Sequence, residues 1–417
     1  MSELNGEGVP AVVTDHGLPP AALRRVTAVL CASQIVSWGV LFYAFPVLAP
    51  SIAEDTGWSP TAVVAAFTVA QLISAGAGLL VARRLHHQGP RAVMTLGSLL
   101  AVTAVVAVAY AGTWWTFLGA WCLAGTAMAA TLYPPAFAAL TAWGGSRRLQ
   151  ALTALTLVGG LASTVFAPLT AVLDDNIGWR HTYAVLALLL SGTVILHALG
   201  LRQPWTPQHN PAPNPPPSPA GATIGRSPQQ IPGFTRTVAA FALAGLCVWS
   251  LLIAFVPLLT ARGFSTSAAA TALGIGGIGQ VCGRLAYRHL DARTSTRLRT
   301  RLVFVSIAAT TLALAVLPGP YLALVVASFL AGASRGIFTL LQATAVTDRW
   351  GTTDYARLTA ILSFPLMATA AFAPWLATLL ATALGTHALA LSAFAALAAA
   401  STALVPPDAI RPPRTEA

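Results

Sequence analysis

Arg335 is the residue whose chemistry is hardest to explain by packing alone. It lies about 14 residues into the apolar run 321–346, which is roughly 20 Å along a helix that rises about 1.5 Å per residue. A charge inside a membrane costs roughly 2.5–3.5 kcal/mol on insertion scales. No Asp or Glu lies deep in any apolar run of the sequence, so the carboxylate of a bound organic anion would suit the guanidinium. The alternative is a structural arginine that bonds backbone carbonyls of neighbouring helices.

Amide and aromatic side chains also recur at helical spacing, both in the run that holds Arg335 and in the first apolar run. Gln34 and Trp38 are four residues apart, and Arg335, Phe338 and Gln342 share one face of a second helix. An amide that faces lipid is costly, which favours a polar contact for Gln34. Packing against lipid or a neighbouring helix stays the alternative for each aromatic residue.

Several kinds of chemistry are excluded or disfavoured by residue type. All 23 basic residues are arginine, so the chain cannot contain a lysine-bearing nucleotide-binding loop, and ATP-driven pumping by this chain alone is excluded. The four cysteines fall inside apolar runs without metal-type spacing. His197 has no clustered acid or histidine near it, which disfavours an intramembrane enzyme. We expect no catalytic residue, no metal and no cofactor.

The composition predicts an integral membrane protein. Hydrophobic residues make up 56% of the 417 residues and charged residues only 8%, whereas soluble domains carry roughly 25% charged residues. The arginines sit in short clusters between apolar runs rather than on one face, so we expect no nucleic-acid partner in spite of the basic charge. The first apolar run is longer than that of a signal peptide and predicts an uncleaved span.

Twelve apolar runs are long enough to cross a bilayer core of about 30 Å, which needs roughly 20 residues. Their length favours helices over the alternating ten-residue strands of a barrel. We therefore predict an all-α protein with spans at 26–49, 61–82, 92–111, 115–142, 150–172, 180–201, 237–260, 267–287, 301–318, 321–346, 356–382 and 385–405.

The chain divides into two halves, a linker and two tails. Segment 202–235 is rich in proline and poor in apolar residues, which predicts an extended linker. It separates half 26–201 from half 236–405, with cytoplasmic tails at 1–25 and 406–417. With the N-terminus inside, 20 of the 23 arginines fall in cytoplasmic segments, and only Arg180 and Arg262 fall in outside loops. This asymmetry predicts the N-in, C-in orientation.

The two halves repeat each other in sequence. The matches occur in the same order, on equivalent helices, which indicates a duplication rather than chance. Trp143-Gly144 recurs as Trp350-Gly351, Phe166-Ala167-Pro168 as Phe372-Ala373-Pro374, Gly57-Trp58-Ser59 as Gly263-Phe264-Ser265, and the Trp38 and Pro46 pair as Trp249 and Pro257.

Two six-helix repeats of like orientation resemble the major facilitator superfamily. Segment 82–91 is similar to that family's loop between helices 2 and 3, usually written G-x-L-A-D-R-x-G-x-R. Gly89 and Arg91 match, whereas His86 stands where the acid is expected. The resemblance implies that a gating loop contains Arg83, His86, Gly89 and Arg91, with Arg284 in a looser echo between helices 8 and 9. The missing acid implies a weaker latch, and the alternative is that these arginines only set topology.

The resemblance also implies that helices 1, 4, 7 and 10 line a substrate cavity. The motifs of drug/proton antiporters are absent, since Trp121 stands where their helix-4 arginine is expected. The segments around Trp38 and Trp58 loosely resemble the monocarboxylate and oxalate/formate branch, whose arginine lies in helix 8. The candidate substrate-binding residues are Arg335, Gln34, Trp38, Gln280, Gln342, Trp249, Tyr133 and Phe338.

These observations predict a secondary active transporter of a small organic solute, expected to be an organic anion, in the cell (inner) membrane. It would work as a monomer by alternating access, with a coupling proton or counter-anion. The alternative is an efflux pump for a neutral or anionic drug or secondary metabolite.

Overall fold

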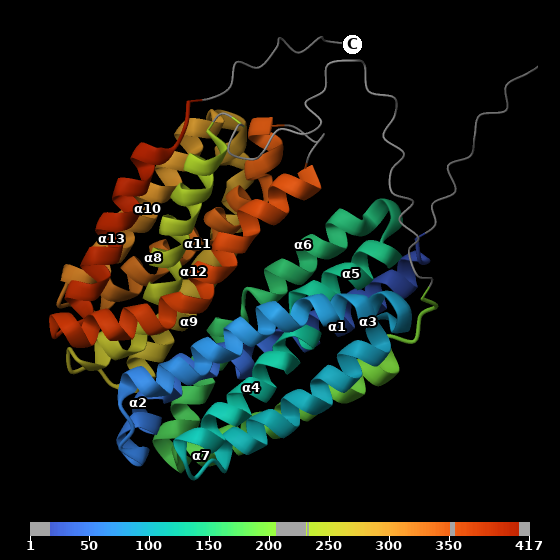
Figure 1. The fold of residues 1–417 in the computed structure, drawn as a ribbon, viewed down its shortest axis with the longest axis horizontal. Coiled ribbons are helices and arrows are strands. Elements are labelled where there is room, and N and C mark those ends of the chain that lie inside the picture. The colour runs from blue at the N-terminus through green and yellow to red at the C-terminus, as the bar shows by residue number, and fades with distance from the viewer. Residues whose placement is uncertain (1–16, 206–230, 232, 351–354, 408–417) are drawn as a thin grey trace, which may run out of the picture.

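The computed structural model describes residues 17–205, 231, 233–350 and 355–407, which form helices joined by short turns (Figure 1). The N-terminal half contains α1 (Pro20–Trp38), the π-helix η1 (Gly39–Tyr43), α2 (Ala44–Thr56), α3 (Pro60–Ala109), α4 (Trp114–Thr131), α5 (Tyr133–Trp143), the 3-10 helix η2 (Gly145–Arg147), α6 (Arg148–Gly159) and α7 (Ala162–Gly200). The C-terminal half contains α8 (Phe234–Thr260), α9 (Thr266–Arg293), α10 (Thr296–Val316), α11 (Tyr321–Trp350), α12 (Tyr355–Leu384) and α13 (His387–Leu404). Most of the expected linker, residues 206–230, lies outside the described residues.

Two long helices are each interrupted by one glycine. Gly89 turns the chain inside α3 with φ 76°, and Gly178 does the same inside α7 with φ 74°. Only glycine adopts these angles without steric cost. Each glycine therefore marks the place where one pass through the bundle ends and the next begins.

Ten helices in the described part of the chain are long and apolar enough to cross a membrane. The stretch Gln150–Gly200 counts once among them although its 51 residues contain the turn at Gly178; at about 1.5 Å per residue it is more than twice the bilayer core. The glycines and arginines of α9 lower its hydropathy and keep it out of the ten. The expected twelve passes fit these observations, and the N-in, C-in orientation remains a prediction.

The sequence repeat is visible as repeated local structure. Gly57 and Gly263 both have positive φ, 70° and 86°. Ser59 and Ser265, two residues later, both cap the following helix by accepting a hydrogen bond from the N–H three residues on. The two halves therefore enter their second helix by the same turn.

The repeated tryptophans Trp143 and Trp350 also have matching roles. Trp143 packs edge-to-face on Trp205, which follows the last helix of the N-terminal half, with ring centroids 6.0 Å apart. Trp350 packs on Phe234, the first residue of α8, at 5.1 Å. Each repeat therefore uses its tryptophan to anchor the chain on one side of the linker.

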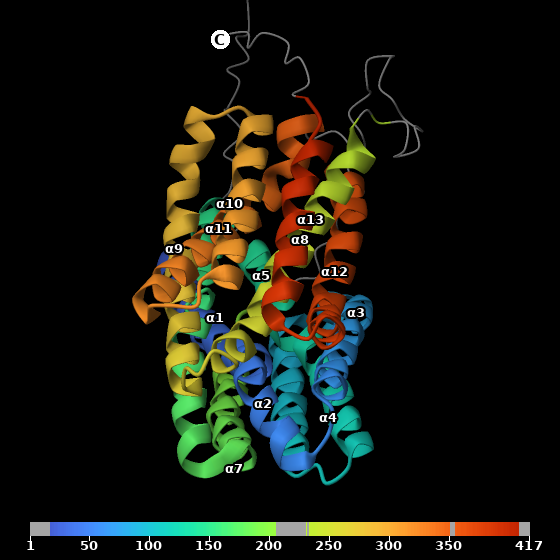
Figure 2. The same ribbon diagram turned by 90° about the vertical axis from the view of Figure 1, so that its left-hand side faces the viewer.

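The halves lie side by side as two helical bundles, the first coloured blue to green and the second yellow to red (Figures 1 and 2). They meet where α9 packs on α7, α12 on α3 and α8 on α2. Large apolar side chains are exposed on the outer helices, which is the surface that lipid requires. Examples are Leu188 at 73%, Leu322 at 71% and Leu80 at 63% exposure.

Small residues on α9 allow the closest helix packing. A β-carbon at Gly332 of α11 would overlap the carbonyl oxygen of Gly276, and one at Gly336 would overlap that of Gln280. Toward the other half, Thr164 of α7 donates from Oγ1 to the carbonyl of Gly274 at 2.8 Å. The glycine face of α9 therefore packs on α11 in its own half and on α7 in the other half.

Candidate functional site

Arg335 projects from the middle of α11 and is paired with a neutral group. Its Nη2 donates to Oε1 of Gln280 on α9 at 2.9 Å. Its Nε is buried and finds no acceptor among the described residues. Tyr43, from the opposite half, lies within electrostatic range of the guanidinium. The structure thus joins two of the sequence candidates, Arg335 and Gln280, at the boundary between the halves.

Arg284 lies in the same region rather than only in a peripheral loop. It projects from α9 and donates through Nη1 to the backbone carbonyl of Thr156 on α6, which belongs to the N-terminal half. It also contacts the hydroxyl of Tyr133. The sequence placed Arg284 near the cytoplasmic end of its helix, and the structure shows that its side chain bridges the halves.

An aromatic cluster covers the N-terminal side of this region. Trp38 packs at a tilt against Tyr133 with ring centroids 5.0 Å apart and meets Phe42 edge-to-face at 5.5 Å. Phe42 in turn meets Trp249 of α8 at 5.9 Å, across the boundary between the halves. Trp38, Phe42 and Trp249 also line a cavity of about 240 Å³ that reaches α12 at Met367. Three of the sequence candidates, Trp38, Tyr133 and Trp249, therefore form one aromatic wall.

The π-helix η1 places Phe42 where it contacts Trp249 of the other half. Pro46 has no N–H for the carbonyl of Phe42, four residues earlier, so the α-helical pattern breaks just before it. Gly39 accommodates the ring of Phe166 where a β-carbon would overlap it. Tyr43 ends this turn. Tyr43 and Phe42 are not among the residues predicted from the sequence, and Pro46, four residues after Phe42, is the signal that points to them.

The remaining substrate candidates make contacts with groups other than Arg335. Gln34 is fully buried and donates to the carbonyl of Thr131 at 2.7 Å, while its own Oε1 has no partner among the described residues. Phe338 is buried in the C-terminal half between Phe241 and Phe304, at 5.8 and 6.2 Å. Gln342 is half-buried, two turns along α11 from Arg335.

The segment between the second and third passes is largely exposed, and its side chains and backbone bond groups of its own half. Arg83 and His86 are exposed, and Arg91 donates from Nε to the carbonyl of Ala198 at 2.9 Å. Trp205 donates from Nε1 to the carbonyl of His86 at 3.0 Å and packs on Gly89, where a β-carbon would lie 2.8 Å from the indole. Backbone and aromatic contacts therefore hold this loop in the described structure.

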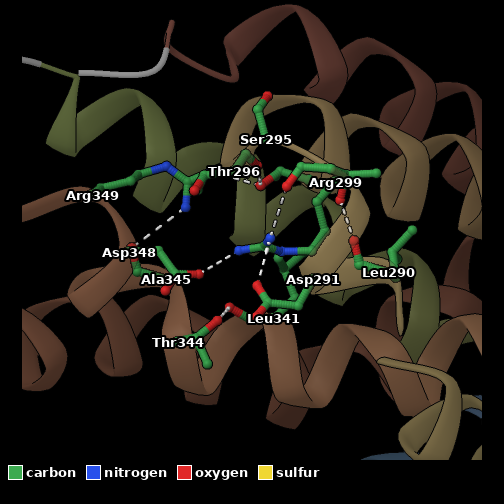
Figure 3. A network of polar contacts seen from close by, with 12 residues as sticks. Leu290, Asp291, Ser295, Thr296, Arg299, Leu341, Thr344, Ala345, Asp348 and Arg349 are labelled. Carbon is green, nitrogen blue, oxygen red and sulfur yellow. Dashed lines mark hydrogen bonds and ion pairs between the residues drawn. The ribbon is translucent and has the colours of Figure 1, made fainter. Parts of the chain in front are cut away.

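The corresponding end of the C-terminal half is held by charge instead. Arg299 of α10 is only 3% exposed and pairs with Asp291 of α9 and Asp348 of α11, both at 2.6 Å (Figure 3). A buried cation that pairs with two carboxylates is well compensated. In the described part of the chain, carboxylates thus neutralise Arg299 but are not paired with Arg335.

The geometry gives no sign of a metal or of clustered catalytic groups in the described residues. No group of three or more His, Cys, Asp or Glu there could hold a metal ion. The buried His197 shares a hydrogen bond with Ser98 at 2.8 Å. What the region can do is bind, because it presents two guanidinium groups, an amide and aromatic surface at a boundary between two bundles.

Comparisons with known proteins agree with this architecture. No curated protein sequence matches the chain. Among solved structures, it is similar to a mutant form of the nucleoside transporter NupG, with a TM-score of 0.75, 11% sequence identity, and coverage of 92% of this chain and 98% of that one. It is also similar to a bacterial homologue of the human lysosomal transporter Spinster, in an inward-facing and occupied conformation. That TM-score is 0.62, at 14% identity, with coverage of 93% and 95%.

At these identities the solved structures establish the fold, and the sequence itself establishes the family. Residues 30–322, more than half of the chain, match the profile of the Major Facilitator Superfamily. Its members bind small molecules within a lipid bilayer, which agrees with the apolar outer surface and the polar boundary described above. The chain is a multi-pass membrane transporter that belongs to the major facilitator superfamily.

Proposed function

We propose that this transporter moves an organic anion across the cytoplasmic membrane by alternating access, with Arg335 as the counter-ion of the substrate. The observation that supports the proposal is the environment of Arg335. It lies within a membrane span, its hydrogen-bond partner is the neutral amide of Gln280, and its Nε has no acceptor in the described part of the chain. A carboxylate would satisfy the charge and the free N–H together.

Electrostatics favour a ligand over a structural role for this arginine. A charge within a span costs roughly 2.5–3.5 kcal/mol, and charged groups there are usually paired. Arg299 shows how this chain compensates a structural arginine, with two carboxylates at 2.6 Å. Arg335 has no such compensation in the described residues, so an anion bound to it would offset the cost of its charge within the span.

Alternating access suits the contacts between the halves. The boundary combines close glycine packing on α9 with a few polar bridges, such as that from Arg284 to Thr156. Such contacts can be exchanged as one bundle rocks on the other. We propose a monomer oriented N-in and C-in, with halves 26–201 and 236–405 as the moving bodies. The coupling partner is either a proton or a counter-anion.

The experiment is counterflow in proteoliposomes against labelled carboxylates and neutral metabolites, with and without a pH gradient. We expect Arg335→Gln to weaken anion binding by about 10- to 100-fold, since a hydrogen bond to a charged group contributes about 1.5–3 kcal/mol. Arg335→Lys should recover only part of it, because lysine keeps the charge but lacks the planar fork. Arg288→Gln, on an exposed face of α9, is the control. Unchanged affinity in Arg335→Gln would overturn the counter-ion role.

Efflux of a neutral aromatic compound is the second candidate. It is favoured by the cavity of about 240 Å³ that Trp38, Phe42 and Trp249 line. Aromatic rings stack on such walls without requiring charge. The same counterflow panel separates the two candidates, because a neutral substrate would be insensitive to the charge at position 335.

A further inference from the structure

Two arginines of the C-terminal half lie at nearly the same depth. Gly332 packs on the carbonyl of Gly276, and Gly336 packs on that of Gln280, so α9 and α11 run parallel with a shift of 56 positions. The contact of Gly283 with Ala333 gives a smaller shift between the residue numbers of the two helices. The mean of the two shifts places Arg284 level with a residue about two positions beyond Arg335, which is roughly 3 Å along the helix axis. The two cations also repel each other electrostatically.

The groups around this pair are neutral. Arg284 bonds the carbonyl of Thr156 and the hydroxyl of Tyr133, and Arg335 bonds the amide of Gln280. Tyr43 of the other half lies within electrostatic range of Arg335. The three ion pairs in the described residues are those of Arg180 and Arg299, so no carboxylate there compensates either cation.

We propose that the site takes a dianion, with one negative group on Arg335 and the other on Arg284. The inference rests on the proposed function and narrows its substrate class. A monoanion would neutralise one guanidinium and leave the second facing only dipoles, in an environment where an uncompensated charge is costly. A short dicarboxylate places two acceptors within reach of two cations at one depth.

Arg284 can exchange its present partners for a charged one at a gain. Hydrogen bonds to ionised acceptors are roughly twice as strong as those between neutral groups, so a carboxylate competes well against the carbonyl of Thr156. Both present partners of Arg284 belong to the N-terminal half. Binding of the second negative group therefore changes a contact between the halves, which links the charge of the substrate to their relative movement.

The test uses one carbon skeleton with two, one or no charges. Succinate, monomethyl succinate and dimethyl succinate, with the same series built on malonate and glutarate, are compared as ligands of the purified full chain. The readouts are thermal stabilisation in detergent and competition for counterflow. We expect the dianion of at least one series to bind about 10-fold or more tightly than its monoester, as expected for one added charged hydrogen bond.

The variants separate the roles of the two arginines. Arg284→Gln should remove the preference for dianion over monoester while monoester binding stays within about 3-fold of wild type. Arg335→Gln should weaken both, and Arg288→Gln, one turn from Arg284 on an exposed face, should change neither.

Two different results would separate failure of this inference from failure of the proposed function. If wild type binds monoesters as well as dianions in every series, or if Arg284→Gln weakens both alike, the dianion site is wrong while anion transport stands. If only the neutral diesters bind, the proposed function fails as well.

Discussion

Gln34 donates to a carbonyl that a proline leaves without its usual helical donor inside the membrane. Pro135 lacks the N–H that would bond the carbonyl of Thr131, four residues earlier, and the helix breaks at Leu132 between α4 and α5. Gln34 of α1 supplies the missing donor at 2.7 Å. The amide therefore joins the first and fourth passes, and its role as a substrate ligand stays a prediction.

Replacing this amide should cost stability. Gln34→Leu leaves the buried carbonyl of Thr131 without a donor, a loss of about 1–3 kcal/mol, so the melting temperature of the detergent-solubilised protein should fall measurably. Gln150→Leu, at an exposed position on α6, is the matched control and should melt like wild type. A Gln34→Leu protein as stable as the control would show that the hydrogen bond contributes nothing.

Phe338 shares helical spacing with Arg335 but packs against different neighbours. Three residues along a helix rotate a side chain by roughly 300°, which leaves it about 60° from the first. That rotation carries Phe338 away from Arg335 and into the aromatic core of the C-terminal half beside Phe241 and Phe304. Helical spacing alone therefore does not predict that two side chains meet the same ligand when the helix is surrounded by other helices.

At the scale of the elements, two arginines cap the C-terminal ends of helices. Arg180 donates from Nη1 to the carbonyls of Ala109 and Ala111, where α3 ends, at 3.1 and 2.9 Å. Arg262 donates to the carbonyls of Leu314 and Ala315, where α10 ends. A cation at a helix C-terminus satisfies free carbonyls and the helix dipole. This role explains why two arginines occupy the predicted outside loops against the general bias.

The glycine contact between α9 and α11 should tolerate no side chain. Gly332→Val would drive its β-carbon into the carbonyl of Gly276 and separate the helices that carry Gln280 and Arg335. We expect a large loss of monodisperse protein in fluorescence-detected size exclusion. Gly192→Val in α7 has nothing within 4 Å of its β-carbon and serves as the control. Equal yields of the two variants would contradict the packing argument.

At the scale of the whole molecule, the proposed alternating access requires the halves to separate where α7 packs on α9. A β-carbon at position 274 would lie 3.3 Å from the α-carbon of Thr164, which is close enough for a disulfide. In a background with the four native cysteines replaced by serine, Thr164→Cys with Gly274→Cys should cross-link on oxidation and stop transport. A reducing agent should restore it.

Each single cysteine variant is the control for this experiment, because neither alone can bridge the halves. If the cross-linked protein transports at the wild-type rate, the halves do not need to separate at this contact, and alternating access would have to use another part of the boundary.

The sequence by itself determined the all-helical membrane architecture, the division into two duplicated halves and the unusual position of Arg335. These features depend on local hydropathy, repeated short motifs and the cost of a charge in lipid, and all three can be read along one chain. The structure confirms the helices and adds the reason for the matching turns at Gly57 and Gly263.

Only the tertiary structure decided which side chains meet. It brought Arg284 to the level of Arg335, placed Tyr43 within electrostatic range of Arg335 and packed Phe338 into the aromatic core of the C-terminal half. Those positions depend on the register of α9 against α11 and on breaks such as η1, which turn side chains by amounts that linear spacing does not contain. The physical reason is that a helix face is defined by its neighbours, and neighbours far apart in sequence are chosen by packing.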